Sequence, residues 1–323
     1  MKNIAIIGSG MTGLSLAHNL DKNNITIFDK SWRPGGRVST RKNENLLFDH
    51  GAHYLSINHE VDQLRILLNN LNIVDTKEIN FSANFLKKEI LRKRILIGKN
   101  GMNSIPRKIF NYLKIKSYFN TKITKIIKMN DKYSIFADHK EFNDFDLVLV
   151  CIPYLQAKEI TSEFIDFNAK HEPRYEPIYT VMLSYEKDNN IKLDGGLNLH
   201  NDISFFMKQN FKFPELKDEC WVLNLSSNFT AKNLDIDNKL LEEKVISIFE
   251  RSFNINQKPK FQNTHRWLYA QTKITYNSLS KKNWIGSKDS KIFLSGDWVM
   301  GKSVSDAWNA GLQLSYYLKI LNY

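Results

Sequence analysis

The glycines near the N-terminus are the first residues whose types and spacing could do chemistry. In Gly8-Ser9-Gly10-Met11-Thr12-Gly13, Gly8 permits a tight turn, Gly10 lets the main chain approach a pyrophosphate, and Gly13 lets a helix lie close to the preceding strand. Asp29 ends the next apolar segment, where an acid binds ribose hydroxyls. The pattern predicts a dinucleotide site without distinguishing NAD from FAD. The alternative is a glycine-rich turn that binds no ligand.

A second motif, Arg33-Pro34-Gly35-Gly36-Arg37, comes shortly after Asp29. Its adjacent glycines let main-chain amides crowd against a phosphate or a ribityl chain, and Arg37 offers a permanently charged fork to phosphate oxygens. At this distance from a dinucleotide motif, the segment favours FAD over NAD. The alternative is a surface turn with a solvated arginine.

Residues 48–54 form a third motif, which includes His50, Gly51, Ala52 and His53. It mixes an apolar anchor, titratable groups and a flexible glycine. Taken alone it is a weak signal, because either histidine could be a hydrogen-bonded structural residue.

The fourth motif lies near the C-terminus, where Gly296-Asp297-Trp298 follows an apolar segment and precedes a helix. The Asp297 carboxylate is placed to accept hydrogen bonds from a polyol chain such as ribityl. The helix start around Ser303-Val304 can stabilise negative charge on a flavin pyrimidine ring. The alternative makes Asp297 an ordinary turn residue or helix cap.

These motifs need strands and helices to position them. Residues 4–7 are a short apolar run typical of a strand buried on both faces, and residues 25–28 are a second one. Between them Leu14, Ala17 and Leu20 recur at helical spacing, so the chain opens with a strand–helix–strand unit. Further helices are predicted at 61–71, 240–253 and 307–321, and further strands at 146–151, 178–185, 220–225 and 292–294.

The predicted fold class is α/β, with a Rossmann-like FAD-binding domain and an inserted, mixed-sheet substrate domain. The first and last segments both have the pattern of one nucleotide-binding layer, so the second domain is inserted between them. The FAD-binding domain is expected to comprise residues 1–57, 99–160 and 262–323, and the substrate domain residues 58–98 and 161–261.

Composition limits the partners. The net charge of +12 comes from lysines spread along the chain rather than from one basic block, so no nucleic-acid partner is expected, whereas a phosphorylated small molecule is compatible.

The two cysteines, Cys151 and Cys220, have no metal-like or disulfide-framework spacing, so we expect no metal and a reducing, cytoplasmic setting. No apolar run is long enough to span a membrane. The N-terminal glycine pattern outweighs a superficial likeness to a signal peptide.

Together these motifs resemble the renalase family within the flavin amine oxidases. The matching stretches are GSGMTGLSLA, IFDKSWRPGGRVSTR, FDHGAHY, GKNGMNSIPRKI, HRW at 265–267, and LSGDWVMGKSVSDAWNAG. The resemblance implies FAD and oxidation of a 2- or 6-dihydro isomer of NAD(P), with dioxygen as acceptor and NAD(P)⁺ and hydrogen peroxide as products. The FAD is expected to be noncovalent, because neither cysteine lies in the C-terminal motif.

The resemblance also implies site residues. For the substrate pocket they are His53, Trp267, Tyr269, Gln271 and Trp298, with no catalytic side chain assigned, because hydride transfer depends on positioning. For the cofactor they are Gly8, Ser9, Gly10, Met11, Thr12, Gly13, Asp29, Lys30, Gly35, Gly36, Arg37, His50, Gly51, Ala52, Ile123, Gly296, Asp297, Ser303, Val304 and Ala307.

The chain departs from the family pattern in places. Asp29 replaces the usual glutamate, His53 replaces the usual glutamine, and residues 155–260 match poorly outside 173–183. Two other functions therefore stay open. One is an amine oxidase or desaturase of the same fold, and the other is a flavin-binding redox sensor without turnover.

Overall fold

A computed structural model describes the chain except residues 57–62, 139, 187 and 290. The chain forms two compact units. Unit 1 comprises Met1–Arg37, Pro106–Tyr175 and Gln271–Tyr323, and unit 2 comprises Val38–Ile105 and Glu176–Ala270. The α/β class and the insertion of one unit into the other along the chain agree with the expectation from sequence.

Unit 1 is built on a six-stranded sheet with the order β18-β19-β12-β1-β2-β8. All neighbours pair in parallel except β18 with β19. The predicted strands at 4–7, 25–28, 146–151 and 292–294 are confirmed in this sheet. Its strands are β1 (Asn3–Ile7), β2 (Asn24–Phe28), β8 (Lys116–Tyr118), β12 (Leu147–Val150), β18 (Ile285–Gly286) and β19 (Ile292–Leu294).

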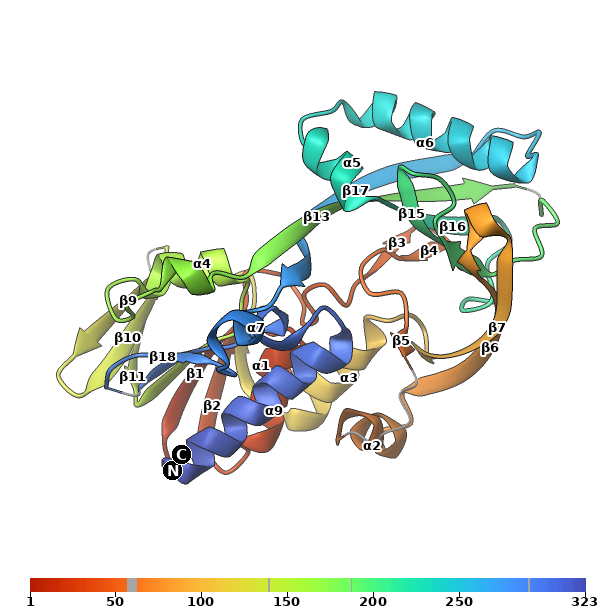
Figure 1. The fold of residues 1–323 in the computed structure, drawn as a ribbon. Helices are drawn as coiled ribbons and strands as arrows, with labels where there is room; N and C mark the ends of the chain where they lie inside the picture. The colour runs from red at the N-terminus through yellow and green to blue at the C-terminus, as the bar shows by residue number, and fades with distance from the viewer. Residues whose placement is uncertain (57–62, 139, 187, 290) are drawn as a thin grey trace. The chain divides into compact units, whose positions relative to one another are not determined.

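Helix α1 (Met11–Asn19) follows β1 and packs against the C-terminal helix α9 (Val304–Ile320), as Figure 1 shows. Both helices were predicted. They approach closely because Gly311 has no side chain: a Cβ atom there would lie 2.5 Å from the Thr12 carbonyl oxygen. The other elements of unit 1 are β9 (Lys125–Met129), β10 (Lys132–Ala137), β11 (Lys140–Phe145), α4 (Tyr154–Thr161), η2 (Ala169–His171), α7 (Tyr276–Ser280), α8 (Asp297–Met300) and most of α3 (Ser104–Leu113).

Unit 2 contains an eight-stranded mixed sheet with the order β17-β13-β16-β15-β14-β6-β7-β5. The strands predicted at 178–185 and 220–225 are confirmed as β13 and β16. The sheet consists of β5 (Leu55–Ser56), β6 (Val74–Asn84), β7 (Glu89–Gly98), β13 (Arg174–Tyr185), β14 (Gly195–Leu197), β15 (Ile203–Lys208), β16 (Glu219–Leu225) and β17 (Phe261–Ile274).

Two helices of unit 2 were predicted from the sequence. The helix predicted at 240–253 is confirmed as α6 (Asn238–Phe253). The helix predicted at 61–71 appears as α2 (Gln63–Asn70), and the first two residues of that prediction lie outside the described ones. The remaining elements are β3 (Thr40–Asn43), β4 (Leu46–Asp49), η1 (Phe85–Lys87) and α5 (Ser227–Lys232).

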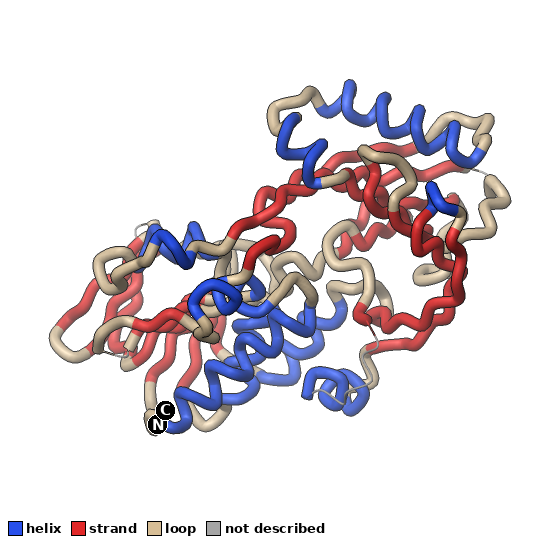
Figure 2. The backbone as a smooth tube through the Cα atoms, viewed as in Figure 1, coloured by secondary structure: helices blue, strands red, loops and turns tan. Residues whose placement is uncertain are grey.

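The two faces of the unit 2 sheet are covered differently (Figures 1 and 2). One face packs on α6 through a core that includes Phe206, Trp221 and Phe249. The other, here called the hairpin face, packs on the β3–β4 hairpin, where Phe48 stacks on Phe261 with 5.5 Å between ring centroids. Because side chains alternate along a strand, the odd-numbered residues of β17 from Phe261 to Tyr269 share the hairpin face.

The unit boundaries differ from the sequence-based domain boundaries. Residues 38–57, 99–105 and 262–270 were expected with the FAD-binding domain but lie in unit 2, where the β3–β4 hairpin and β17 pack together. Residues 161–175 were expected with the substrate domain but lie in unit 1, where Ile165 joins the core. The functional division into FAD-binding and substrate domains stays a prediction.

Candidate cofactor and substrate sites

The three glycines of the first motif have different physical roles. A Cβ atom at Gly8, which has φ +106°, would lie 2.6 Å from the Cys151 carbonyl oxygen, and one at Gly13 would lie 2.1 Å from the Gly8 oxygen. Protein packing therefore requires both glycines. Gly10 has an ordinary φ of −70°, and a Cβ atom there would meet no protein atom within 4 Å. Gly10 thus faces open space at the start of α1, which fits a ligand approaching the main chain.

The second motif folds against the first. The Gly35 amide donates a hydrogen bond of 3.0 Å to the Ser9 carbonyl oxygen. Gly35 and Gly36 have φ values of +128° and +55°, in the region that favours glycine. A Cβ atom at Gly36 would lie 3.8 Å from the Gly10 Cα atom. The two glycine motifs therefore border the same open space.

Asp29 holds the first glycine motif in place through hydrogen bonds to Ser9. Its Oδ2 atom accepts hydrogen bonds from the Ser9 amide at 2.7 Å and the Ser9 hydroxyl at 2.5 Å, and its Oδ1 atom accepts one from the Ser31 amide. Lys30 beside it is exposed. The carboxylate thus shapes the glycine loop, and its contact with a ribose stays a prediction.

Arg37 and Asp297 come from motifs at opposite ends of the chain and form a bidentate ion pair. The distances are 2.8 Å from Nη1 to Oδ2 and 2.5 Å from Nη2 to Oδ1. The Asp297 side chain is 8% exposed and that of Arg37 is 32% exposed. Burial acts to lower the pKa of Arg37, but the Asp297 carboxylate outweighs it and the pKa is raised. Unit 1 therefore brings the phosphate and ribityl candidates into direct contact.

The start of α9 is capped within the chain. Ser303 and Asp306 form a reciprocal capping box, in which the Ser303 hydroxyl accepts from the Asp306 amide and the Asp306 carboxylate accepts from the Ser303 amide. The Thr12 hydroxyl donates to the Ala307 carbonyl oxygen at 2.7 Å, which joins the first motif to α9. Val304 lies between these contacts and is half-buried.

Three further candidates in unit 1 lie mainly in packed surroundings. Trp298 is fully buried, and its indole donates to the Ile152 carbonyl oxygen at 3.2 Å. A Cβ atom at Gly296 would lie 2.4 Å from the Trp298 indole nitrogen, so this glycine makes room for that ring. Ile123 belongs to the apolar core. Packing alone accounts for Trp298 and Ile123, and their contact with a ligand stays a prediction.

In unit 2, the residues of the third motif are organised by Asp49. Its Oδ1 atom accepts hydrogen bonds from the Thr40 hydroxyl at 2.6 Å and the Met102 amide at 2.9 Å. Its Oδ2 atom pairs with the buried Lys212 ammonium at 3.2 Å, and Lys212 also donates to the His53 carbonyl oxygen at 2.7 Å. Asp49 and Lys212 thus hold both ends of the 49–53 segment. Sequence reasoning did not single out either residue, and Lys212 has no motif of its own.

The hydrogen bonds of His53 determine its tautomer. Its Nδ1 atom lies 2.9 Å from the Asp49 carbonyl oxygen, which can only accept, so Nδ1 carries the proton. Its Nε2 atom then accepts from the Asn224 amide at 2.9 Å. Burial, followed by the Lys212 charge, lowers the pKa of His53 to about 3. His53 is therefore a neutral ring with both nitrogens occupied, stacked on Phe205 at 4.3 Å.

This pKa gives a pH-dependent stability. The folded-state pKa of His53 lies below the unfolded value of about 6.5, so the unfolded chain binds the proton more readily and stability falls as the pH drops below 6.5. Between pH 6.5 and 5 we expect His53 to contribute a loss of about 1.5 kcal/mol. Denaturant unfolding of the wild type and of His53→Gln at both pH values measures it. An equal pH dependence in the two proteins would contradict this assignment.

A second aromatic group lies on the hairpin face. The Trp267 indole donates to the His50 carbonyl oxygen at 3.0 Å, and its ring lies 4.2 Å from that of His265. Gly51 and Ala52, which follow His50, are half-buried. Tyr269 shares the parity of Trp267 on β17, and Gln271 follows with the same parity in unit 1. His53 stacks on Phe205, which pairs with Asn224, and Asn224 shares the parity of Val222, which packs with Phe48 of the hairpin. Trp267 and His53 are therefore both on the hairpin face.

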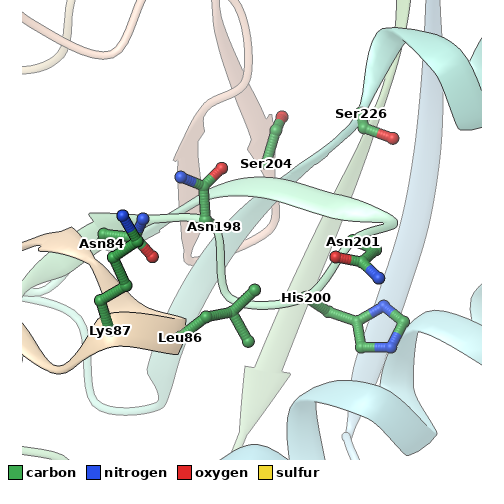
Figure 3. A pocket seen from close by; sticks show the side chains of 8 residues that line it. All are labelled: Asn84, Leu86, Lys87, Asn198, His200, Asn201, Ser204 and Ser226. Carbon is green, nitrogen blue, oxygen red and sulfur yellow. The ribbon is translucent and has the colours of Figure 1, made fainter.

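A pocket of about 270 Å³ in unit 2 holds none of the predicted site residues (Figure 3). Most of its lining residues are polar. They come from the end of β6 and η1, from the β14–β15 turn and the start of β15, and from the N-cap of α5, and include Asn84, Lys87, Asn198, His200, Ser204 and Ser226. None of its lining residues belongs to the four motifs of the sequence.

Comparison with known proteins gives the family. The model of the flavin-containing amine oxidoreductases matches residues 83–317, and that of the NAD(P)-binding Rossmann-like domain matches residues 6–71. The chain belongs to the flavin-containing amine oxidoreductase family. It is therefore an FAD-dependent oxidoreductase, and the four motifs belong to a flavoprotein.

Individual relatives are distant. Mouse renalase is 23% identical over 84% of this chain and 85% of its own length. Mitochondrial protoporphyrinogen oxidase of tobacco is 26% identical over 43% of this chain, which spans only 27% of that enzyme. A triple mutant of putrescine oxidase superposes with a TM-score of 0.78 at 11% identity, covering 99% of both chains. That structure shows the shared fold. Within the described residues, every helix is too short or too polar to cross a membrane.

Proposed function

We propose that this flavoenzyme oxidises a dihydronicotinamide dinucleotide whose extra hydride lies at ring position 2 or 6. The substrate, a proton and dioxygen give NAD(P)⁺ and hydrogen peroxide, so atoms and electrons balance. The distant similarity to mouse renalase along most of the chain supports this substrate over others of the family. The basic net charge is compatible with a phosphorylated ligand.

The observation that carries the proposal is the uncharged aromatic stack of His53 and Phe205 on the hairpin face. His53 is neutral and lies flat on Phe205, and both of its nitrogens are already hydrogen-bonded. It therefore provides a surface for a flat ring and no available proton acceptor. A dihydropyridine donates a hydride without losing a proton to a base. The reaction therefore needs only a flat aromatic surface and the correct orientation of the ring.

The residues of unit 1 would hold FAD. Gly10 and Arg37 would contact the pyrophosphate, Asp297 the ribityl chain, and Asp29 the ribose. FAD, when bound, accepts the hydride and passes the electrons to dioxygen. We propose that it binds noncovalently, because burial raises the pKa of both cysteine thiols, that of Cys220 to about 12, which keeps them protonated and poorly nucleophilic.

Steady-state assays test the proposal. With 2- or 6-dihydro NAD(P), the holoenzyme should consume one dioxygen and form one hydrogen peroxide per NAD(P)⁺ produced, while ordinary 4-dihydro NADH stays inert. Turnover of a primary amine, with both isomers inert, would instead make the protein an amine oxidase. No turnover with any substrate would favour the redox-sensor alternative.

A further inference from the structure

The ammonium group of Lys93 lies among aromatic rings on the hairpin face of unit 2. In the β6–β7 ladder Phe81 pairs with Leu91 and Ile79 with Lys93, so Phe81 and Lys93 share a face. Phe81 also pairs with Gly195, a neighbour of Met207, on the face that carries Phe205. Lys93 therefore lies on the same side of the sheet as His53 and Phe205.

The contacts of the Lys93 ammonium are with neutral groups. It donates a 2.8 Å hydrogen bond to the Tyr54 hydroxyl, and it lies 4.6 Å from the Tyr54 ring centroid and 4.4 Å from that of Phe81. Among the described residues, no carboxylate forms an ion pair with it. The neighbouring Arg92 is on the opposite face and pairs with Glu78 at 2.9 Å. Lys212, which donates to the His53 carbonyl oxygen, pairs with Asp49.

The geometry points to an oxyanion subsite formed by Lys93 and Tyr54, next to the aromatic surface of Phe205 and His53, for a planar substrate that carries a phosphate or a carboxylate. The inference deepens the proposed function and rests on it for the identity of the substrate. The binding chemistry itself depends only on this face.

The physical basis is an ammonium held by neutral partners. Cation–π contacts and the Tyr54 hydroxyl fix its position without cancelling its charge. The Tyr54 hydroxyl, which accepts from Lys93, can donate its own proton to the same oxyanion. Tyr54 lies 6.5 Å from Phe205, and Phe205 lies 4.3 Å from His53, centroid to centroid, so an aromatic surface continues from the charged end. A cationic amine would be repelled from this end of the face.

Calorimetric titration of the holoenzyme tests this subsite with three probes. Nicotinamide mononucleotide carries a phosphate, nicotinate carries a carboxylate, and nicotinamide is uncharged. We expect the wild type to bind at least one charged probe more tightly than nicotinamide. Lys93→Met, which keeps the aliphatic packing, should weaken binding of that probe about tenfold and change nicotinamide binding less than twofold. Lys93→Arg should retain most of the preference.

Arg92→Met is the matched control, because it removes the same charge from the adjacent position on the other face. It should leave all three affinities unchanged, and melting temperatures should show that every variant is folded. Preference for the phosphate probe or for the carboxylate probe distinguishes the two oxyanions. The subsite is overturned if the wild type binds neither charged probe more tightly than nicotinamide, or if Lys93→Met binds them as well as the wild type. Flavin reduction by the dihydro isomers is measured separately, so a wrong substrate is distinguishable from a wrong subsite.

Discussion

Gly10→Val is expected to abolish FAD binding and to leave the apoprotein folded. A Cβ atom at Gly10 meets no protein atom within 4 Å, and the φ of −70° suits any residue, so the valine side chain would occupy only the space assigned to the pyrophosphate. We expect affinity for FAD to fall by at least about a hundredfold, equivalent to about 2.7 kcal/mol. Flavin absorbance per chain measures binding, and thermal melting of flavin-free protein measures the fold.

Gly13→Ala is the matched control in the same motif. Its Cβ atom would lie 2.1 Å from the Gly8 carbonyl oxygen, so the strand-to-helix contact must shift at a cost of about 1–3 kcal/mol with or without flavin. The two variants should therefore separate ligand binding from folding. If Gly10→Val retained stoichiometric FAD, the pyrophosphate would not lie at the start of α1.

Breaking the Arg37–Asp297 pair is expected to have the second large effect. Asp297→Ala leaves the Arg37 guanidinium without its bidentate partner, and Arg37→Ala leaves a carboxylate that is 8% exposed. Removing one partner of a buried pair costs about 3–5 kcal/mol, and the one-third exposure of Arg37 reduces this to about 2–3 kcal/mol. Both single variants should also lose flavin, because each residue is assigned to the cofactor as well.

A double-mutant cycle separates the two roles. If the ion pair dominates stability, the double variant should be destabilised by about as much as one single variant rather than by the sum, with a coupling energy of about 1–3 kcal/mol. Denaturant unfolding of the flavin-free proteins measures this, and flavin content is recorded in parallel. Additive losses would mean that the two side chains act independently and that their contact has no energetic weight.

The parallel sheet of unit 1 was predictable because its strands are buried on both faces. Such strands are continuous apolar runs, as in residues 4–7 and 25–28, and β1 and β12 are buried along nearly their whole length. The first glycine motif was recognisable because its spacing is local. Gly13 is required by its contact with Gly8, although Gly8 itself is required by Cys151 after β12. The sequence alone therefore located the glycine loop, while the packing that requires Gly8 depends on the pairing of β1 with β12.

The β6–β7 hairpin was not predicted, and its residues explain why. Most of the first half of β7 is exposed, and β6 alternates incompletely, with Asp75 and Thr76 both exposed. Such segments lack the apolar run or regular alternation that indicates a strand. Lys93, which we propose binds an oxyanion of the substrate, lies in this hairpin and carried no signal in the sequence.

The contacts around His53 were also beyond sequence reasoning. Lys212 and Asn224 approach the 49–53 segment from far along the chain, through the pairing of β15 with β16 and the turn that follows β15. No local pattern indicates such a contact. The sequence located His53 as a candidate, but its tautomer, its neutrality and its stacking on Phe205 depend on the tertiary structure.

Anaerobic stopped-flow reduction of the bound flavin tests whether the protein oxidises dihydronicotinamide isomers. Equal concentrations of 2-, 6- and 4-dihydro NAD(P) and a primary amine are mixed with the holoenzyme, and flavin absorbance is followed without dioxygen. We expect rapid bleaching by the 2- or 6-dihydro isomer and reduction at least about a hundredfold slower by 4-dihydro NADH, because a misplacement of about 1 Å can cost that factor. Fast bleaching by the amine, with the dihydro isomers inert, would contradict it.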